Sequence, residues 1–102
     1  MPKAVKQLAP IPPGEILREE FMKPLNISQN RLARDIDLNP ARVNDIVHGR
    51  PTITAAVALR LGKYFGTAPE VWMNLQSSYD LRCERAKTWP KIEPRVRVLA
   101  AE

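Results

Sequence analysis

The chain has 102 residues, 44% of them hydrophobic, and a formal net charge of +5 with a sequence pI near 9.8. This length and apolar content predict one folded domain with a single modest core and exclude wholesale disorder. No stretch approaches the roughly 20 apolar residues that a membrane span needs, and the N-terminus lacks the apolar segment of a secretory signal. The single cysteine, Cys83, offers no intramolecular disulfide, so we expect a cytoplasmic protein with no membrane partner.

The positive charge permits a polyanionic partner but does not identify one. Basic residues gather near the ends of the chain: Lys3 and Lys6 lie near the start, and residues 82–102 hold six basic against three acidic side chains. Residues 28–50, by contrast, hold four arginines against three aspartates. A nucleic-acid function must therefore be argued from the helical pattern and not from the net charge.

Helical periodicity divides the chain into three parts. Residues 1–13 are rich in proline and predict an irregular arm, residues 14–88 predict a helical domain, and residues 89–102 form a short tail. Within the domain the apolar spacing predicts five helices around one core, so the expected fold class is all-α. The expected helices cover residues 14–22, 28–36, 40–48, 55–65 and 69–87.

Several residues predict where these helices begin and end. Thr54 is expected to cap the fourth helix, and Gly66 is expected to close it. Thr67 and Glu70 have the spacing of a capping box at the start of the fifth helix, with Pro69 inside its first turn. Further along, two more prolines are expected to end regular helix altogether, at positions 90 and 94.

The long fifth helix carries aromatic residues on one face. Trp72, Leu75 and Tyr79 follow helical spacing, which favours a place in the core over a stacking platform for single-stranded nucleic acid. The same helix could also supply a dimer seam, because so small a core cannot enclose it on every side. Cys83 follows Tyr79 by four residues and is expected to pack there and not to react, since no neighbouring histidine or paired cysteine activates it.

The segment 28–50 has the pattern of a helix-turn-helix. Ser28 and Asn39 stand at N-cap positions, Pro40 takes the first position of the second helix, and Leu38 fills the turn. The apolar residues of the two helices fall where crossed helices would touch: Leu32, Ala33, Ile36, Val43, Ile46 and Val47. In such a motif the second helix commonly enters the DNA major groove.

Polar residues on the outer face of that second helix are therefore candidates for reading base edges. Arg42 could bond guanine O6 and N7 together, and Asp45 could accept a hydrogen bond from cytosine N4. Asn39 could reach a base edge or a phosphate, and Ala41 is small enough to touch a thymine methyl group. The alternative is that all four are solvated positions on a surface helix.

Two further residues are predicted to contact phosphates. Gln29 lies just after the cap of the first helix of the motif, where a side-chain amide and unpaired backbone N–H groups can clamp a phosphate. Arg50 lies in the loop after the second helix. His48 could join them or could simply pack before Gly49, and a lone histidine predicts no metal site.

Three carboxylates near the start of the domain, Glu15, Glu19 and Glu20, predict a charged outer face and not a catalytic site. The chain supplies no nucleophile with a base, no cluster of metal ligands and no glycine-rich phosphate loop. We therefore expect no enzyme, no catalytic residue, no bound metal and no cofactor.

The sequence also resembles a known family, the HigA/VapI-type antitoxins of the lambda-repressor-like (XRE) helix-turn-helix group. The resemblance rests on the following segments: PPGEILREEFMKPL (12–25), SQNRLARDI (28–36) and RVNDIVHGRPTITAAVALRLGKYFGTAPEVWMNLQSSYDL (42–81). It covers roughly three-quarters of the chain. The run from His48 to Gln76 is specific to this branch. The resemblance implies a five-helix lambda-repressor-like domain.

By the same resemblance, such proteins dimerise, bind a palindromic operator in their own promoter, and neutralise a HigB-like toxin, an mRNA-cleaving ribonuclease of the RelE type. Carried over residue by residue, the DNA contacts fall on Gln29, Asn39, Ala41, Arg42, Asp45 and Arg50. Two positions depart from the family. Asp37 replaces the usual turn glycine, although aspartate tolerates the left-handed conformation better than most residues, and Asn39 replaces a frequent proline.

Other functions remain open at this point. The chain could be a stand-alone transcriptional regulator without a toxin, or a protein-interaction module whose helix-turn-helix no longer binds DNA. A toxin could be gripped by the tail, where Val96, Val98 and Leu99 could add a short strand to the toxin or to a second protomer. The acidic first helix is a rival surface, suited to a basic ribonuclease.

Overall fold

A computed structural model describes residues 10–100, and these residues form helices with no strand among them. The predicted all-α fold is confirmed. The helices are α1 (Pro13–Ile16), the π-helix η2 (Leu17–Met22), α2 (Gln29–Asp35), α3 (Pro40–Val47), α4 (Ala55–Phe65), α5 (Pro69–Lys87), α6 (Trp89–Ile92) and the 3₁₀-helix η3 (Glu93–Arg95). Most of the expected arm, including Lys3 and Lys6, lies outside the described residues.

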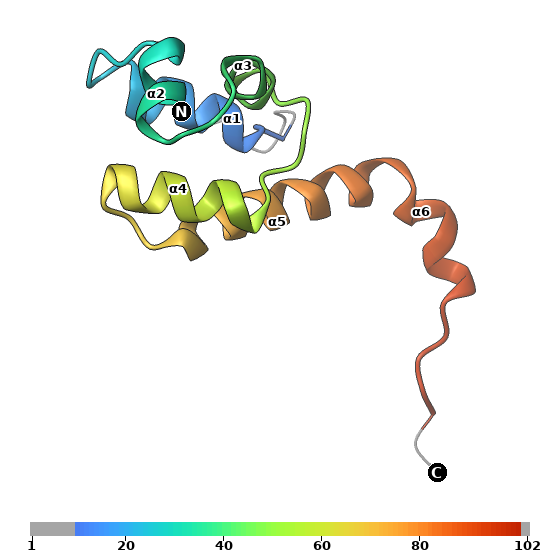
Figure 1. Ribbon diagram of the computed structural model, residues 1–102. Helices are drawn as coiled ribbons and strands as arrows, with labels where there is room; N and C mark the ends of the chain where they lie inside the picture. The colour runs from blue at the N-terminus through green and yellow to red at the C-terminus, as the bar shows by residue number, and fades with distance from the viewer. Residues whose placement is uncertain (1–9, 101–102) are drawn as a thin grey trace, which may run out of the picture.

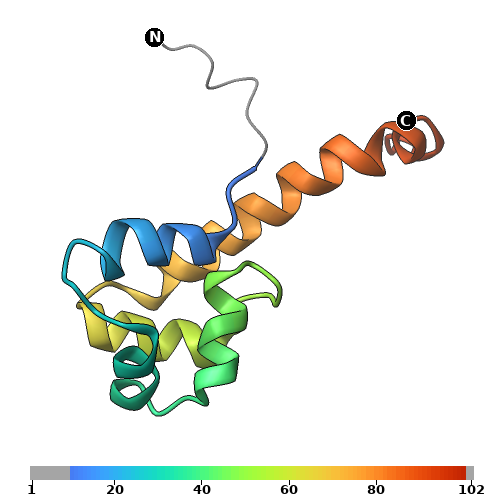
Figure 2. The same cartoon turned by 90° about the horizontal axis from the view of Figure 1, so that it is seen from above.

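The helices form a small body from which the C-terminal part projects. Helices α1, α2 and α3 lie on one side of the core, and α4 and α5 lie on the other (Figure 1). Helix α5 packs along α4 with its first half and then runs out past the body, as the view from above also shows (Figure 2). Within the described part of the chain, no helix has the length and apolar character to cross a membrane.

The core is built mainly from the apolar faces that the sequence predicts, but the placement of Tyr79 in it is wrong, because Tyr79 is half-buried and does not join the core cluster. Trp72 is completely buried, and the centre of its ring lies 5.0 Å from that of Phe21 and 6.4 Å from that of Phe65, so η2, α4 and α5 share one aromatic cluster. The buried apolar residues are Leu17, Met22, Leu32, Ala33, Ile36, Val43, Ile46, Val47, Ile53, Val57, Ala58, Leu61 and Trp72. Leu38 packs against them from the turn, as predicted.

The predicted first helix has the expected extent, but its second half winds more widely than an α-helix. In a π-helix the backbone hydrogen bond joins residues five apart, as from the N–H of Lys23 to the carbonyl of Arg18. Residues five apart therefore come close to the same face, and Leu17 and Met22 are both buried. In an α-helix, Leu17 and Met22 would point in different directions. The wider winding of the π-helix lets both side chains point into the core.

The turn between α2 and α3 has the geometry that Asp37 was expected to adopt. Its φ is 58°, in the left-handed region, and Ile36 and Leu38 on either side face the core. At the end of α3, Gly49 has φ of 75° and lies against Pro12, where a Cβ would come within 3.0 Å of the proline side chain. Glycine is favoured there for both reasons.

Helix α2 is also tied to α4 by polar contacts. The hydroxyl of Tyr64 donates to a carboxylate oxygen of Asp35 at 2.7 Å, and the guanidinium of Arg60 donates to the carbonyl of Ile36 at 3.0 Å. The hydrogen bond from Tyr64 is the main cause that lowers the pKa of Asp35 below its usual range. These contacts hold the C-terminal end of α2 in place, where the turn to α3 begins.

The predicted capping box at the start of α5 is wrong. The N-cap is Ala68, and no side chain caps the helix. The hydroxyl of Thr67 instead accepts a hydrogen bond from the indole N–H of Trp72 at 3.0 Å. Because Trp72 is fully buried, its N–H needs a partner, and this need takes precedence over capping.

The expected end of regular helix at Pro90 is also wrong, because that proline lies in the first turn of α6 and Pro94 lies in the first turn of η3. A proline is tolerated there since the first backbone N–H groups of a helix have no intrahelical partner. The short strand that residues 95–98 could add to a partner's sheet stays a prediction, and in the single chain this segment extends away from the body (Figure 1).

Gly14 allows helix α1 to lie directly against the recognition-helix candidate α3. A Cβ at this position would overlap the backbone carbonyl oxygen of Ile46 and crowd the Cα of Val47. We expect Gly14→Ala to lower the free energy of unfolding by about 1–3 kcal/mol, because two backbones must separate. Urea unfolding followed by circular dichroism measures this loss. Glu15→Ala, on an exposed neighbour, is the control, and equal stabilities of the two variants would refute the close contact.

Candidate nucleic-acid interface

The two helices of the motif begin at the capping residues that the sequence predicts. The hydroxyl of Ser28 accepts from the backbone N–H of Arg31 at 3.0 Å, and the side-chain oxygen of Asn39 accepts from the backbone N–H of Ala41 at 2.7 Å. The cap of α3 thus occupies the carbonyl oxygen of the Asn39 side chain. The NH₂ group of this side chain remains available as a donor to DNA, and the oxygen, which has two lone pairs, can still accept one further hydrogen bond.

A network of four polar side chains connects α2, α3 and the loop that follows. The amide nitrogen of Asn44 donates to the side-chain oxygen of Gln29 at 3.0 Å. The oxygen of Asn44 accepts from the guanidinium of Arg50 at 3.2 Å, and the same guanidinium pairs with Asp45 at 2.9 Å. Gln29, Asp45 and Arg50, predicted separately from the sequence, are therefore held together, with Asn44 as the connecting residue.

Arg42 is less exposed than predicted. The sequence places it on the fully outward face of α3, but in the structure it is half-buried, and its Nε atom is buried without a hydrogen-bond partner among the described residues. The physical reason is that the aliphatic stem of an arginine beside Val43 packs along the helix while only the end of the side chain reaches water.

The remaining predicted residues lie on the surface. Ala41 and Asn39 are exposed at the start of α3, next to Arg42 along the helix. His48 is exposed, and its Nδ1 atom lies 2.7 Å from the carbonyl oxygen of Asn44; since a carbonyl only accepts, Nδ1 carries the proton. His48 therefore packs back on its own helix through one ring nitrogen.

Asn44 is the residue of this surface that the sequence pattern did not single out. A signal was available, because Asn44 lies three residues after Ala41 and four before His48, on the same outer side of the helix. Its importance comes from its partners on another helix, which spacing along the chain does not disclose.

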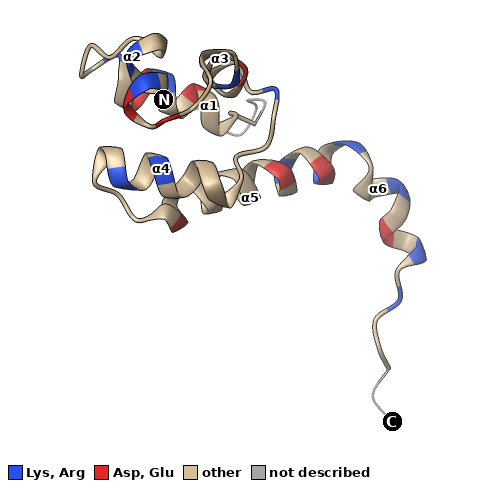
Figure 3. Ribbon diagram, viewed as in Figure 1, with Lys and Arg blue, Asp and Glu red and all other residues tan. Residues whose placement is uncertain are grey.

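The surface carries both signs of charge. Both acidic and basic positions lie along α2 and α3, whereas basic positions dominate beyond the end of α5 (Figure 3). Within residues 10–100 no group of three histidine, cysteine, aspartate or glutamate side chains is arranged to hold a metal ion. What the site offers is a short, capped helix with hydrogen-bond donors and acceptors along its outer side.

Two short helices crossed over a core, with a polar second helix presented outward, define a helix-turn-helix DNA-binding domain. Comparison with known families agrees: the helix-turn-helix family model matches residues 19–72. The chain belongs to this family, in its branch of HigA/VapI-type antitoxins.

Three similar proteins support this assignment. Virulence-associated protein I of Dichelobacter nodosus is 44% identical over 82 residues, which are 80% of this chain and 76% of that protein. The Pseudomonas aeruginosa antitoxin HigA, solved with the higBA promoter, is 45% identical with a TM-score of 0.85 over 89% of this chain and 99% of that one. The antitoxin GraA in complex with its operator is 41% identical, with a TM-score of 0.86 over 92% and 95%. The lambda-repressor-like fold expected from the resemblance is confirmed.

Proposed function

We propose that this chain is the antitoxin of a toxin–antitoxin pair and represses its own promoter by binding an operator sequence through α3. The observation that carries the proposal is the network that joins Gln29, Asn44, Asp45 and Arg50, because it orients polar groups from both helices of the motif toward one side. Solved relatives of the same fold are antitoxins bound to promoter or operator DNA. Promoter binding and neutralisation of an mRNA-cleaving toxin both take place in the cytoplasm, and neither requires catalysis by this chain.

Within this proposal the side chains divide by task. Arg42 reads guanine, Asp45 accepts from cytosine, and Ala41 touches a thymine methyl group in the major groove. Gln29 and Arg50 clamp phosphates on the two flanks, and Asn39 donates from its NH₂ group to a base edge or a phosphate. In the protein alone Asp45 is paired with Arg50, so DNA would have to separate the pair for both to act.

A single copy reads only one half of a palindrome. Two copies related by a twofold axis would place their α3 helices roughly 34 Å apart, which is one turn of B-DNA. The proposal therefore includes a homodimer, and a palindromic site with half-sites one helical turn apart.

The toxin partner is proposed to be a HigB-like ribonuclease of the RelE type. Co-expression with the small reading frame next to this gene tests it, scored by co-purification and by rescue of growth. Toxicity that this chain relieves, together with a stable complex, is the expected result. DNA binding without any toxic neighbour would instead identify a stand-alone transcriptional regulator, and failure to retard its own promoter would favour a protein-interaction module.

Arg50 is expected to act on every DNA sequence alike. Replacing Arg50 by alanine should weaken binding to the operator and to a scrambled duplex by a similar factor, and should lower the slope of log affinity against log salt by about 1. Fluorescence anisotropy across a salt series measures both quantities. Lys87→Ala removes the same charge from the exposed end of α5, outside the predicted DNA-contact residues, and should change neither. A loss confined to the operator would show that Arg50 reads bases.

A further inference from the structure

The hydrogen bonds that join the two helices of the motif have a fixed direction. The guanidinium of Arg50 carries only donors, so the atom of Asn44 that faces it at 3.2 Å must be the oxygen. The NH₂ group of Asn44 then lies on the other side of the amide and donates to Gln29 at 3.0 Å. Because an NH₂ group only donates, the atom of Gln29 that faces it is again the oxygen. The guanidinium of Arg50 thus sets, through Asn44, the orientation of an amide on α2.

The groups that this arrangement leaves free are donors. The NH₂ group of Gln29 has no hydrogen-bond partner within residues 10–100, since the oxygen is the atom turned to Asn44. Arg50 uses Nε and Nη2 toward Asp45 and Asn44, which leaves Nη1 without a partner among the same residues. The oxygens of a DNA phosphate accept hydrogen bonds, so both free groups suit a phosphate.

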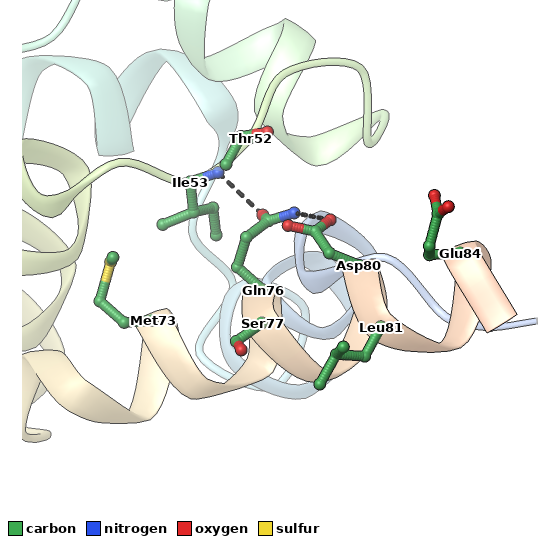
Figure 4. Close-up of a pocket in the computed structure, with 8 residues that line it drawn as sticks. All are labelled: Thr52, Ile53, Met73, Gln76, Ser77, Asp80, Leu81 and Glu84. Atoms are coloured by element: carbon green, nitrogen blue, oxygen red, sulfur yellow. Dashed lines mark hydrogen bonds between the residues drawn. The ribbon is translucent and has the colours of Figure 1, made fainter. Parts of the chain in front are cut away.

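The loop that carries Arg50 is anchored on both sides of this residue. On the near side the backbone N–H of Arg50 donates to the carbonyl of Asp45 at 3.1 Å. On the far side the side-chain oxygen of Gln76, which is 6% exposed, accepts from the backbone N–H of Ile53 at 2.8 Å, and its nitrogen donates to Asp80 at 2.9 Å (Figure 4). With the backbone held, the contacts of the Arg50 side chain decide where its guanidinium lies.

Holding these side chains before DNA arrives lowers the cost of binding. Gln29 and Arg50 are long side chains at the surface, and a phosphate contact immobilises each of them at a cost in conformational entropy. Asn44 has a shorter side chain on α3 and loses less freedom in holding both. A contact that exists in the free protein need not be formed at the expense of the DNA complex.

We propose that Asn44 is a positioning residue, which presents Gln29 and Arg50 to the DNA backbone with their donors outward. It acts through these two side chains and does not itself contact DNA. The inference rests on the proposed function, and it adds that the phosphate contacts from α2 and from the loop after α3 depend on one residue between them.

A double-mutant cycle on DNA affinity tests this role. Asn44→Ala should weaken binding to the operator and to a scrambled duplex about fivefold each, because both phosphate contacts lose their orientation. In a chain that already carries Gln29→Ala and Arg50→Ala, the same substitution should cost less than about twofold. Fluorescence anisotropy measures all four chains at one salt concentration, chosen low enough for the weakest of them to bind.

Asn74→Ala is the matched control, because it removes the same amide from an exposed position on α5 and should leave both affinities unchanged. An equal loss with and without Gln29 and Arg50 would overturn the positioning role, and so would a loss confined to the operator or no loss at all. Equal affinities of the wild-type chain for the two duplexes would count against the proposed function, while the cycle on the scrambled duplex would still test Asn44.

Asn44→Asp tests the orientation itself. A carboxylate keeps the acceptor for Arg50 but has no donor, so Gln29 would turn its NH₂ group toward it and lose that group for the phosphate. The added negative charge repels DNA whether or not Gln29 is present. Asn44→Asp should therefore cost about threefold more affinity in the wild-type chain than in a Gln29→Ala chain. Equal costs in the two chains would overturn the control of Gln29 by Asn44.

Discussion

Trp72→Ala is expected to lower the free energy of unfolding by about 3–5 kcal/mol. The indole is completely buried, contacts Phe21 and Phe65, and donates to Thr67, so its removal opens a cavity and leaves the Thr67 hydroxyl without this partner. A domain of this size has about 5–15 kcal/mol of stability in total, so the variant should be close to unfolded at 37 °C.

Thermal and urea unfolding followed by circular dichroism measure this effect. Trp72→Phe keeps an aromatic ring against Phe21 but removes the N–H, so its loss should be smaller than that of the alanine variant. Equal losses would mean that the hydrogen bond to Thr67, and not packing, is the main contribution. A loss below about 1 kcal/mol in the alanine variant would contradict the central place of Trp72 in the core.

Arg42→Ala is expected to lower operator affinity by about 1–3 kcal/mol and to relax sequence preference at one base pair. The reason is that a guanidinium bonds two atoms of guanine at once, and no other residue at this end of α3 can replace it. In the protein alone the buried Nε atom of Arg42 has no partner among the described residues. Anisotropy titrations with the operator and with single-base variants measure both effects.

Two controls make the Arg42 result interpretable. Arg42→Lys keeps the charge but not the paired hydrogen bonds, so it should retain affinity for any DNA while losing discrimination. A melting temperature recorded for each variant separates lost recognition from lost folding, since the stem of Arg42 is half-buried. An unchanged footprint and an unchanged affinity in Arg42→Ala would show that α3 is not the reading element at this position.

Periodicity and local chemistry predicted most of the fold. Helices α3, α4 and α5 lie within a residue of the ranges expected for them, because their apolar faces repeat at helical spacing and their ends carry caps or turn residues. The left-handed conformation of Asp37 was also predictable, since it depends on one residue in a tight turn.

Features that depend on partners distant in the sequence could not be predicted in this way. Thr67 has the spacing of a cap but bonds to Trp72, and Asn44 looks like an ordinary surface residue until Gln29 and Arg50 are brought to it. The half-burial of Arg42 could not be predicted for the same reason. The apolar pattern of one helix predicts which side faces outward, but not how a long side chain packs on neighbouring residues.

The central claim is that α3 and its neighbours read a specific DNA sequence. The most direct test is the affinity of the wild-type chain for a duplex from its own promoter compared with a scrambled duplex of equal length and composition, at one fixed salt concentration. The account predicts that the promoter binds tighter by a factor on the order of 10³ or more, and that Arg42→Ala reduces this ratio. Equal affinities of the wild-type chain for the two duplexes would contradict it.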